Sequence, residues 1–515
     1  MHHIKGQARN QFQLLCLEQM VSPDSYVRVI DVFVDAIDML SFGFQHAQVR
    51  EEGRPPYNPA ALLKLYIYGY KFGIRSSRKL EYQAATNLEV RWLLNEQTPS
   101  NRTISAFRKE NATAFRQVFR KFVYMLKQAD LIGGEIIAID SFKVRGQNSL
   151  KNNYNEKKIK RHLDYIDARI DEFGQAMDHA DQQEEKEEFK RKISVQKQRR
   201  QKYENLQQEL DDSEQEQIST IDRDARAVIL HRGVVNVGYT IQASVDAKHK
   251  LIAETDTGDV NDTRALAPVA IATKQTLEVE GFNVLADKGY HTGEQLSRCA
   301  DENIVTFVSP KEPASNDEDI FPIGRFAYQP ETNTYLCPAN ETLSTNGNWH
   351  AHSTRGQKTA FRFQRYNTPK CKGCLLRAQC TKGKANGRNI DRSEFAGIIE
   401  QNNQRVNANL DYYKLRQQLA EHPWGTMKRQ WGFDHVLVKG KERVMGEVSL
   451  VFTAYNLTRV LAVVGGIDGF KALLKRLSAR FKSFRNSFLA PKYIYVQILA
   501  AGNFSACFAI RQFTD

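Results

Sequence analysis

The chain has 515 residues, of which 73 are lysine or arginine and 60 are aspartate or glutamate, so its net charge is +13 at pH 7. This length predicts roughly two to four domains, and the basic balance favours a polyanionic partner because neutralised phosphates release counterions. A membrane-spanning helix is excluded, since no run of about eighteen apolar residues occurs in the sequence.

The composition also bears on the cellular setting. The first residues, MHHIKGQARNQFQLL, lack the apolar core of a secretory signal peptide. We therefore expect a soluble, cytoplasmic protein with no membrane partner, associated with the nucleoid if its partner is DNA. In that reducing setting we expect the seven cysteines to be thiols or metal ligands rather than disulfides.

Residues 1–130 are predicted to form a helical N-terminal domain that binds DNA. Apolar residues recur at helical spacing in VRVIDVFVDAIDML and again after Pro59, which suits a helix start, and either Ser100 or Asn101 suits the cap of a later helix. Cations gather near the predicted helix starts, where they suit phosphate or base contacts. These candidates are Arg75, Arg78, Lys79, Arg102 and Arg108. A helical bundle with a solvated basic face explains the same pattern equally well.

Two aspartates follow short apolar runs further along the chain. In GGEIIAIDSFKVRG the run ends at Asp140, and in VLADKGYH a second run ends at Asp287. Such runs are typical of buried strands, and carboxylates at the ends of neighbouring strands converge on one place. Carboxylate oxygens are the ligands that Mg²⁺ or Mn²⁺ prefers. The alternative is that each aspartate merely starts a turn.

Residues 150–222 are predicted to form an inserted antiparallel coiled-coil hairpin. Apolar residues alternate at spacings of four and three along its first helix, which is a heptad seam. They are Leu163, Ile166, Ile170, Phe173 and Met177. The second helix carries a more interrupted stripe and the basic run FKRKISVQKQRRQK, for which we favour a solvated surface over a DNA contact.

Strands are predicted again from residue 225, where β-branched residues alternate in places, and a helix is predicted at about 262–275. Without the inserted hairpin, the order is strand, strand, strand, helix, strand. That order matches a ribonuclease-H-like sheet, in which the first and fourth strands lie side by side. We therefore expect an α/β fold with a mixed sheet, in a catalytic domain that spans residues 131–465.

Residues 310–395 are predicted to be a loop-rich insertion that binds zinc. Four of the seven cysteines fall here, and two of them form a CKGC motif whose turn directs both sulfurs toward one ion. The four are Cys337, Cys371, Cys374 and Cys380. The alternatives are four unrelated thiols, or a redox pair, although no thioredoxin-like strand and helix surround the motif.

Residues 404–465 return to helix and offer a further carboxylate. Glu421 lies seven residues before Lys428, so both share one helical face. Glu447 is the competing candidate, but it precedes an apolar run and can instead favour the N-terminal dipole of that helix. Residues 466–515 form a tail with the basic amphipathic segment KALLKRLSARFKSFR, which suits DNA, an anionic surface or a capping role.

These motifs together resemble bacterial insertion-sequence DDE transposases that have an InsH-like N-terminal domain. The resemblance covers the chain up to about residue 465. Its carriers are GRPPYNPAALLKLYIYGY with SSRKLE, TISAFRKEN, AIDSFKV, DRDARAV with GYTIQASVD, ADKGYH, the cysteine pattern, and EHPWGTMKR with GEVSLVFTAYNLTR. Related enzymes carry a Tyr-x₂-Arg-x₃-Glu-x₆-Lys signature, which Tyr413, Arg416, Glu421 and Lys428 match except that four residues separate Arg416 from Glu421.

The resemblance implies a function and a set of roles. Asp140, Asp287 and Glu421 would bind two Mg²⁺ or Mn²⁺ ions, and Tyr413, Arg416 and Lys428 would hold DNA phosphates. The implied partners are double-stranded DNA, as element ends and target, and a second copy of the chain on that DNA. Water would free a 3′-hydroxyl at each end, and that hydroxyl would attack the target. The alternatives are a nuclease of the same fold without strand transfer, and an inactive transposase-derived DNA-binding protein.

Overall fold

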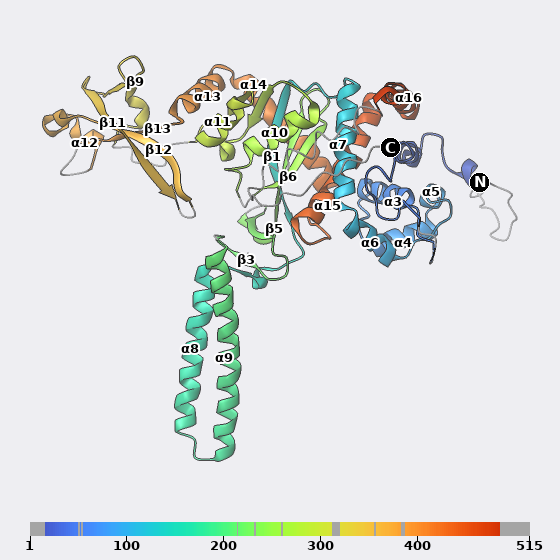
Figure 1. The fold of residues 1–515 in the computed structure, drawn as a ribbon, viewed down its shortest axis with the longest axis horizontal. Helices are drawn as coiled ribbons and strands as arrows, with labels where there is room; N and C mark the ends of the chain where they lie inside the picture. The colour runs from blue at the N-terminus through green and yellow to red at the C-terminus, as the bar shows by residue number, and fades with distance from the viewer. Residues whose placement is uncertain are drawn as a thin grey trace, which may run out of the picture.

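The fold was analysed in a computed structural model of the chain (Figure 1). The structure describes residues 16–49, 52, 55–213, 215–230, 233–258, 261–311, 320–354, 357–382 and 387–484. For residues 353, 354, 357–360 and 478–484 only the backbone is described. The last 31 residues of the predicted basic tail therefore lie outside the described residues, and the part of the tail before them is helical.

A six-stranded mixed sheet lies at the centre of the molecule. Its path runs β4-β5-β1-β7-β8, and β6 pairs with β5. The strand β5 is antiparallel to β1, β4 and β6, whereas β7 is parallel to both β1 and β8. The strands are β1 (Ile136–Arg145), β4 (Arg226–Ile229), β5 (Val235–Asp246), β6 (Ile252–Gly258), β7 (Phe282–Ala286) and β8 (Ile304–Val308). The predicted α/β class with a mixed sheet is thus confirmed.

Helices cover this sheet. The helix α10 contacts β5 and β6, and α14 contacts β1 and β7. Leu419 of α14 lies in a buried cluster with Ala138 of β1 and Leu285 of β7, which fixes α14 over the strands that lead to Asp140 and Asp287. These helices are α10 (Leu266–Leu277), α11 (Gly293–Asp301), α13 (Ala396–Ala408), α14 (Leu410–Trp424), α15 (Lys441–Val463) and α16 (Ile467–Phe484).

The N-terminal part of the chain is helical throughout the elements described. Several of its helices begin at side-chain caps: Ser25, Asn58 and Ser100 each accept a hydrogen bond from a backbone N–H of the first turn. Ser100, rather than Asn101, is therefore the cap of α6. The helices are α1 (Leu17–Met20), α2 (Tyr26–Asp35), α3 (Pro59–Lys71), α4 (Ser77–Thr86), α5 (Leu88–Leu93), α6 (Asn101–Glu110) and α7 (Ala112–Gln128).

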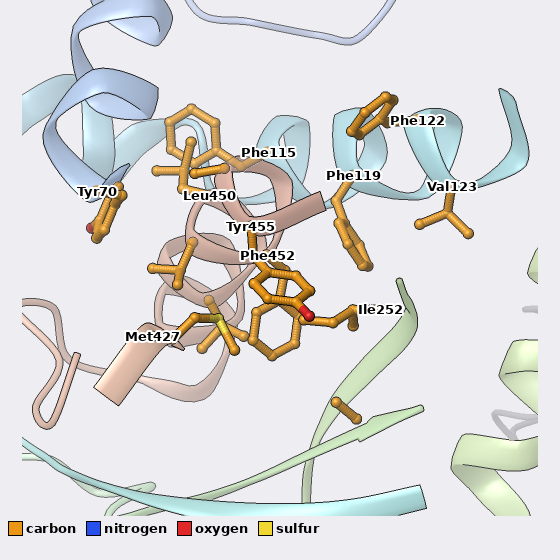
Figure 2. Packing of buried hydrophobic residues seen from close by; sticks show 14 of the residues in the cluster. Tyr70, Phe115, Phe119, Phe122, Val123, Ile252, Met427, Leu450, Phe452 and Tyr455 are labelled. Atoms are coloured by element: carbon orange, nitrogen blue, oxygen red, sulfur yellow. The ribbon is translucent and has the colours of Figure 1, made fainter. Parts of the chain in front are cut away.

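One hydrophobic core joins these helices to the sheet. Figure 2 shows Phe119 of α7 against Phe452 of α15, with Ile252 of β6 close by. Nearly every residue of α15 from Val444 to Leu457 is buried, because the helix is enclosed by α3, α7 and β6. The N-terminal helices and the sheet therefore fold as one packed body in this structure. No single helix in the described part of the chain is long and apolar enough to cross a membrane, although the bent pair formed by α15 and Ile467–Leu477 passes on length and composition.

Two long helices leave the sheet as an arm (Figure 1). They are α8 (Glu156–Asp178) and α9 (Gln183–Asp212), which pack against each other. Ile159, Ile166 and Tyr203 are buried at the base of the arm, where β2 (Asn153–Tyr154) pairs with β3 (Ile218–Ser219). Toward the tip the packing is looser, and the Phe173 and Phe189 rings lie 6.4 Å apart.

The segment predicted to be loop-rich is a small β-structure, which corrects that expectation. Five strands pair in the order β13-β12-β11-β10-β9 and stand apart from the central sheet (Figure 1). The strands are β9 (Ala327–Gln329), β10 (Thr334–Leu336), β11 (Thr342–Thr354), β12 (Gln357–Asn367) and β13 (Ile390–Ser393). The short helix α12 (Arg377–Cys380) lies between β12 and β13 in the sequence. Phe326, Tyr335 and Tyr366 form a core of their own there. Aromatic residues that are far apart in the sequence form this core, so no apolar run in the sequence predicts it.

Candidate active site

Asp140 and Asp287 lie at the same level of two neighbouring parallel strands. Ala138 of β1 pairs with Leu285 of β7, and each aspartate follows its paired residue by two positions. The Asp140 carboxylate accepts a hydrogen bond from the Ser141 N–H at 2.8 Å. The Asp287 carboxylate caps the short turn Lys288–Tyr290 and accepts a hydrogen bond from the Gly289 N–H at 2.8 Å. Backbone donors therefore fix both carboxylates at this edge of the sheet.

A third carboxylate, Asp262, adjoins the pair and was not among the residues predicted. A Cβ placed on Gly289 would lie 2.9 Å from Asp287 Oδ1 and 3.5 Å from Asp262 Oδ2, so the two carboxylates face the same small space. Gln242 Nε2 donates a hydrogen bond to Asp262 Oδ1 at 2.6 Å, and the Tyr290 hydroxyl donates to Gln242 Oε1. Asp262 lies four residues after the end of β6, and that position after a strand is the signal that could have found it.

The electrostatics of Asp140 show that these groups act on one another. Burial, together with the negative charges of Asp287 and Asp262, raises the pKa of Asp140 to about 6. The Ser141 N–H and the Arg416 guanidinium oppose this rise, and Arg416 Nη1 lies 3.7 Å from Asp140 Oδ2. A carboxyl with a pKa near neutrality is unusual for an aspartate and is common at functional sites.

Two further predicted residues approach this edge from the C-terminal helices. Lys428 lies in a turn of π-helix, Gly425–Gln430, with its Nζ 5.2 Å from the centre of the Phe142 ring. Burial lowers the pKa of Lys428, and the charge of Asp140 acts in the opposite direction. Tyr413 is half-buried and packs against the cluster that contains Ala138 and Leu285. Arg416 and Lys428 thus place cations beside Asp140.

Glu421 and Glu447, the two candidates for the third acid, have different surroundings. Glu421 is exposed and accepts a hydrogen bond from Gln417 at 2.9 Å. Glu447 is fully buried, where its carboxylate accepts hydrogen bonds from the Tyr70 hydroxyl at 2.9 Å and the Leu437 N–H at 2.8 Å. Glu447 therefore links α3 to α15 in the core and takes no part in the aspartate site.

The predicted DNA contacts of the N-terminal helices divide into two groups. Arg75 and Arg108 are 6% and 5% exposed, which corrects the expectation that they contact DNA. Arg75 bonds to the His435 carbonyl and ring, and Arg108 donates to the Arg75 carbonyl at 3.1 Å. Both sit over aromatic rings that hold them in the interior. Arg78, Lys79 and Arg102 are exposed, and Arg78 and Arg102 line a groove of about 600 Å³ between α4 and α6.

The four predicted zinc ligands lie near one another in the β-structure. Cys337 directly follows β10, Cys371 and Cys374 lie in and after the turn Pro369–Gly373, and Cys380 ends α12. Burial raises the pKa of the Cys380 thiol, and the other three thiols raise it further. The Cys371 sulfur lies close to the backbone of Gly387, where an added Cβ would approach within 2.7 Å of it.

The donor chemistry fits the metals expected, although the geometry is not that of a formed metal centre. In the part of the chain that the structure describes, no group of three or more histidine, cysteine, aspartate or glutamate side chains has the arrangement of a metal site. The carboxylates of Asp140, Asp262 and Asp287 are hard oxygen donors that suit Mg²⁺. The four thiols are the donors that suit Zn²⁺.

Comparison with known proteins defines the class. Residues 15–110 match the family model described as "Transposase domain (DUF772)", and residues 336–461 match the one described as "Transposase DDE domain". These two matches support an insertion-sequence DDE transposase, the family that the sequence motifs resemble.

Other comparisons add little to this. No curated protein sequence matches the chain. Among solved structures, the chain is similar to a piggyBac transposase synaptic complex with hairpin DNA, with 9% identity and a TM-score of 0.28 over 93% of this chain and 82% of that one. A TM-score at this level carries no argument about the fold.

Proposed function

We propose that the chain catalyses metal-dependent cleavage of the ends of an insertion sequence and joins the freed 3′-hydroxyls to target DNA. The single observation that carries this proposal is the parallel pairing of β1 with β7, which brings Asp140 and Asp287 to one edge of the sheet. Reading the strands β1, β5, β6, β7 and β8 as first to fifth gives the order 3-2-1-4-5. We take this order as support for a ribonuclease-H-like catalytic domain.

The acidic residues would hold the metal ions. Asp140 and Asp287 would be the principal ligands, and Asp262 adjoins them in a position to add a third carboxylate. Divalent ions bound there would activate the attacking oxygen and stabilise the leaving oxygen of a phosphoryl transfer. Glu421, the third acid implied by the resemblance, is exposed on α14 and would need to turn toward the aspartates. We therefore treat Asp262 and Glu421 as competing candidates for the third ligand.

The cations beside the aspartates would position DNA. Lys428 and Arg416 would bind the phosphates that flank the scissile bond, and Arg416 would exchange its contact with Asp140 for a phosphate contact. In the first step water attacks phosphorus, the bond from phosphorus to the 3′-oxygen breaks, and that oxygen leaves as the 3′-hydroxyl. In the second step that hydroxyl attacks a target phosphorus and displaces the 3′-oxygen of the target strand.

Further partners follow from the same proposal. Transposition joins two element ends, so a dimer or larger assembly on double-stranded DNA is expected. The exposed groove between α4 and α6, with Arg78, Arg102 and Lys109, is a candidate for contacts to the element ends. A structural zinc ion on the four cysteines would staple the β-structure of residues 320–395.

An assay with synthetic element ends tests the function. The repeats that flank the gene define the substrate, and pre-cleaved ends with a free 3′-hydroxyl are incubated with target plasmid and Mg²⁺. Joining of ends to the plasmid supports a transposase. Cutting without joining identifies a nuclease, and binding with neither reaction identifies an inactive DNA-binding protein.

A further inference from the structure

A basic cleft lies at the root of the helical arm. It consists of two adjoining hollows of about 660 and about 570 Å³ that share Leu150, Lys151 and Val235 in their walls. We call these two hollows the arm-root cleft. The first hollow reaches up the base of α8 and α9, and the second reaches back to the end of β1. The arm meets the sheet beside β3 and β5 in Figure 1, and Val235 of the lining is the first residue of β5.

The charges in the arm-root cleft are all of one sign. Its lining includes Arg145, Lys151, Lys158 and Arg161, together with two histidines, and among the described residues no aspartate or glutamate lines either hollow. A random choice of charged residues from this chain would include acids almost as often as bases, because the two kinds number 60 and 73. This concentration of positive charge is therefore specific to the cleft.

Most of these cations have no carboxylate partner. Within the described residues, no ion pair involves Arg145, Lys151 or Arg161, although other surface cations of the arm, such as Arg169 and Arg200, are paired. Unpaired like charges repel one another and gain most from a polyanion. Two residues of the lining already have partners. Lys158 Nζ donates to the carbonyls of Leu150, Lys151 and Asn153 at 2.7–3.1 Å, and His435 pairs with Asp434, so these side chains shape the cleft.

Ring packing and backbone hydrogen bonds hold the walls of the cleft. The His162 and Tyr203 rings stack with centroids 4.7 Å apart, and Tyr154 and Tyr203, which are 7% and 8% exposed, pack edge to face. At the other end, Arg145 N–H donates to the Asp434 carbonyl at 2.9 Å and the Arg145 carbonyl accepts from Val436 N–H at 2.8 Å. These contacts fix the backbone from which the cations extend, which reduces the entropy lost on binding.

The cleft is continuous with the strand that carries Asp140. Arg145 lies five residues beyond Asp140 on β1, a distance of about 17 Å along an extended strand. Lys143 lies between them on the same strand. A duplex with its scissile phosphate at Asp140 has roughly ten backbone charges in that length, at one charge per about 1.7 Å of axis. A straight duplex that runs along β1 from Asp140 would therefore present backbone phosphates to the arm-root cleft.

We propose that the arm-root cleft binds the phosphate backbone of duplex DNA on the side of the scissile bond that faces the arm. The inference rests on the proposed function for its ligand, and it adds a specific surface that the catalytic residues do not include. Arg145, Lys151 and Arg161 would contact phosphates without reading the bases. Binding at the cleft is thus independent of sequence, and the arm sets where the duplex enters the active site.

Salt-dependent binding to a labelled random-sequence duplex tests this surface in the full-length protein. The variant is Lys151→Ala with Arg161→Ala. Both side chains are exposed, and neither forms an ion pair within the described residues. The matched control is Lys160→Ala with Lys197→Ala, which removes the same charge from exposed positions of α8 and α9 outside the cleft. Binding is measured by fluorescence anisotropy between about 50 and about 200 mM salt. The slope of log affinity against log salt should fall in magnitude by about two for the cleft variant.

The outcomes separate this proposal from the proposed function. The control variant should keep the wild-type slope, and the cleft variant should weaken binding to element ends and random duplex by the same factor. Equal slopes for the cleft variant and the control would contradict the proposal that the cleft binds DNA. A wild-type protein that binds no duplex would also contradict it. Circular dichroism of both variants shows whether they fold, and a charge-reversal pair, Lys151→Glu with Arg161→Glu, repeats the test. The Asp140→Asn variant should bind like the wild type, so loss of cleavage there leaves the cleft result intact.

Discussion

Asp140 and Asp287 lie 147 positions apart in the sequence, yet each stands two residues beyond the paired positions Ala138 and Leu285 of neighbouring parallel strands. Parallel strands place their carboxyl ends at one edge of a sheet, where side chains from several strands can converge. The energetic consequence of this placement is the raised pKa of Asp140, about 6, of which burial is the largest cause. A half-buried carboxylate within β1 carries a charge that a bound cation can stabilise.

The raised pKa of Asp140 predicts how stability depends on pH. The folded protein holds the Asp140 proton up to about pH 6, whereas the unfolded chain releases it near pH 4. Folding stability in EDTA should therefore fall as the pH rises through this window, by about 1–3 kcal/mol. Asp140→Asn cannot ionise, so it should be more stable than the wild type at pH 7 and equal to it at pH 4. Urea denaturation at both pH values measures this, with the exposed Asp24→Asn as control. An equal difference at both pH values would contradict it.

The third carboxylate can be assigned by comparing two variants. Asp262→Asn should reduce cleavage by at least about 100-fold if Asp262 is a ligand, because a metal site loses affinity when one donor is removed. Glu421→Gln should do the same if α14 turns Glu421 toward the aspartates. Titration of Mn²⁺ by paramagnetic resonance measures metal affinity apart from activity. If only one variant binds Mn²⁺ more weakly, the residue changed in that variant is the third ligand. If both variants bind Mn²⁺ as tightly as the wild type, neither residue is a ligand.

Glu447 is predicted to act on stability and not on catalysis. Removing its carboxylate leaves the Tyr70 hydroxyl and the Leu437 N–H without their acceptor in the core. Glu447→Ala should therefore lower the free energy of unfolding by about 3 kcal/mol. Glu421→Gln at an exposed position should change it by less than about 0.5 kcal/mol. Chemical denaturation of both variants measures these free energies of unfolding. If Glu447→Ala leaves the free energy of unfolding unchanged, the buried network is not formed.

The cysteine cluster should bind zinc. Protein purified under reducing conditions should contain about one zinc ion per chain, and Cys374→Ser should lose it. The β-structure of residues 320–395 should then become sensitive to limited proteolysis, because metal binding adds to its folding free energy. Cys16→Ser, at an exposed cysteine outside the cluster, serves as control. Metal-free wild-type protein that resists proteolysis equally well would refute the site.

The sequence predicted the strands around Asp140 and Asp287 because their burial on both faces appears as an unbroken apolar run. Other features left no such mark. Whether a cation such as Arg108 is buried depends on the carbonyls and rings that the fold brings to it, and these lie on other elements. The core of the β-structure combines Phe326, Tyr335 and Tyr366, which are too far apart to form a periodic pattern. Asp262 follows β6 in the sequence, but its closeness to Asp287 is set by the fold and is seen only in three dimensions.

The most direct test of the central claim is strand transfer by Asp140→Asn compared with the wild type. Pre-cleaved element ends, target plasmid and Mg²⁺ are incubated with each protein, and joined products are quantified alongside binding of the ends. The aspartate site predicts that the wild type joins ends to the plasmid, whereas Asp140→Asn binds the ends with unchanged affinity and joins none. Joining by Asp140→Asn at the wild-type rate would contradict the assignment of this site.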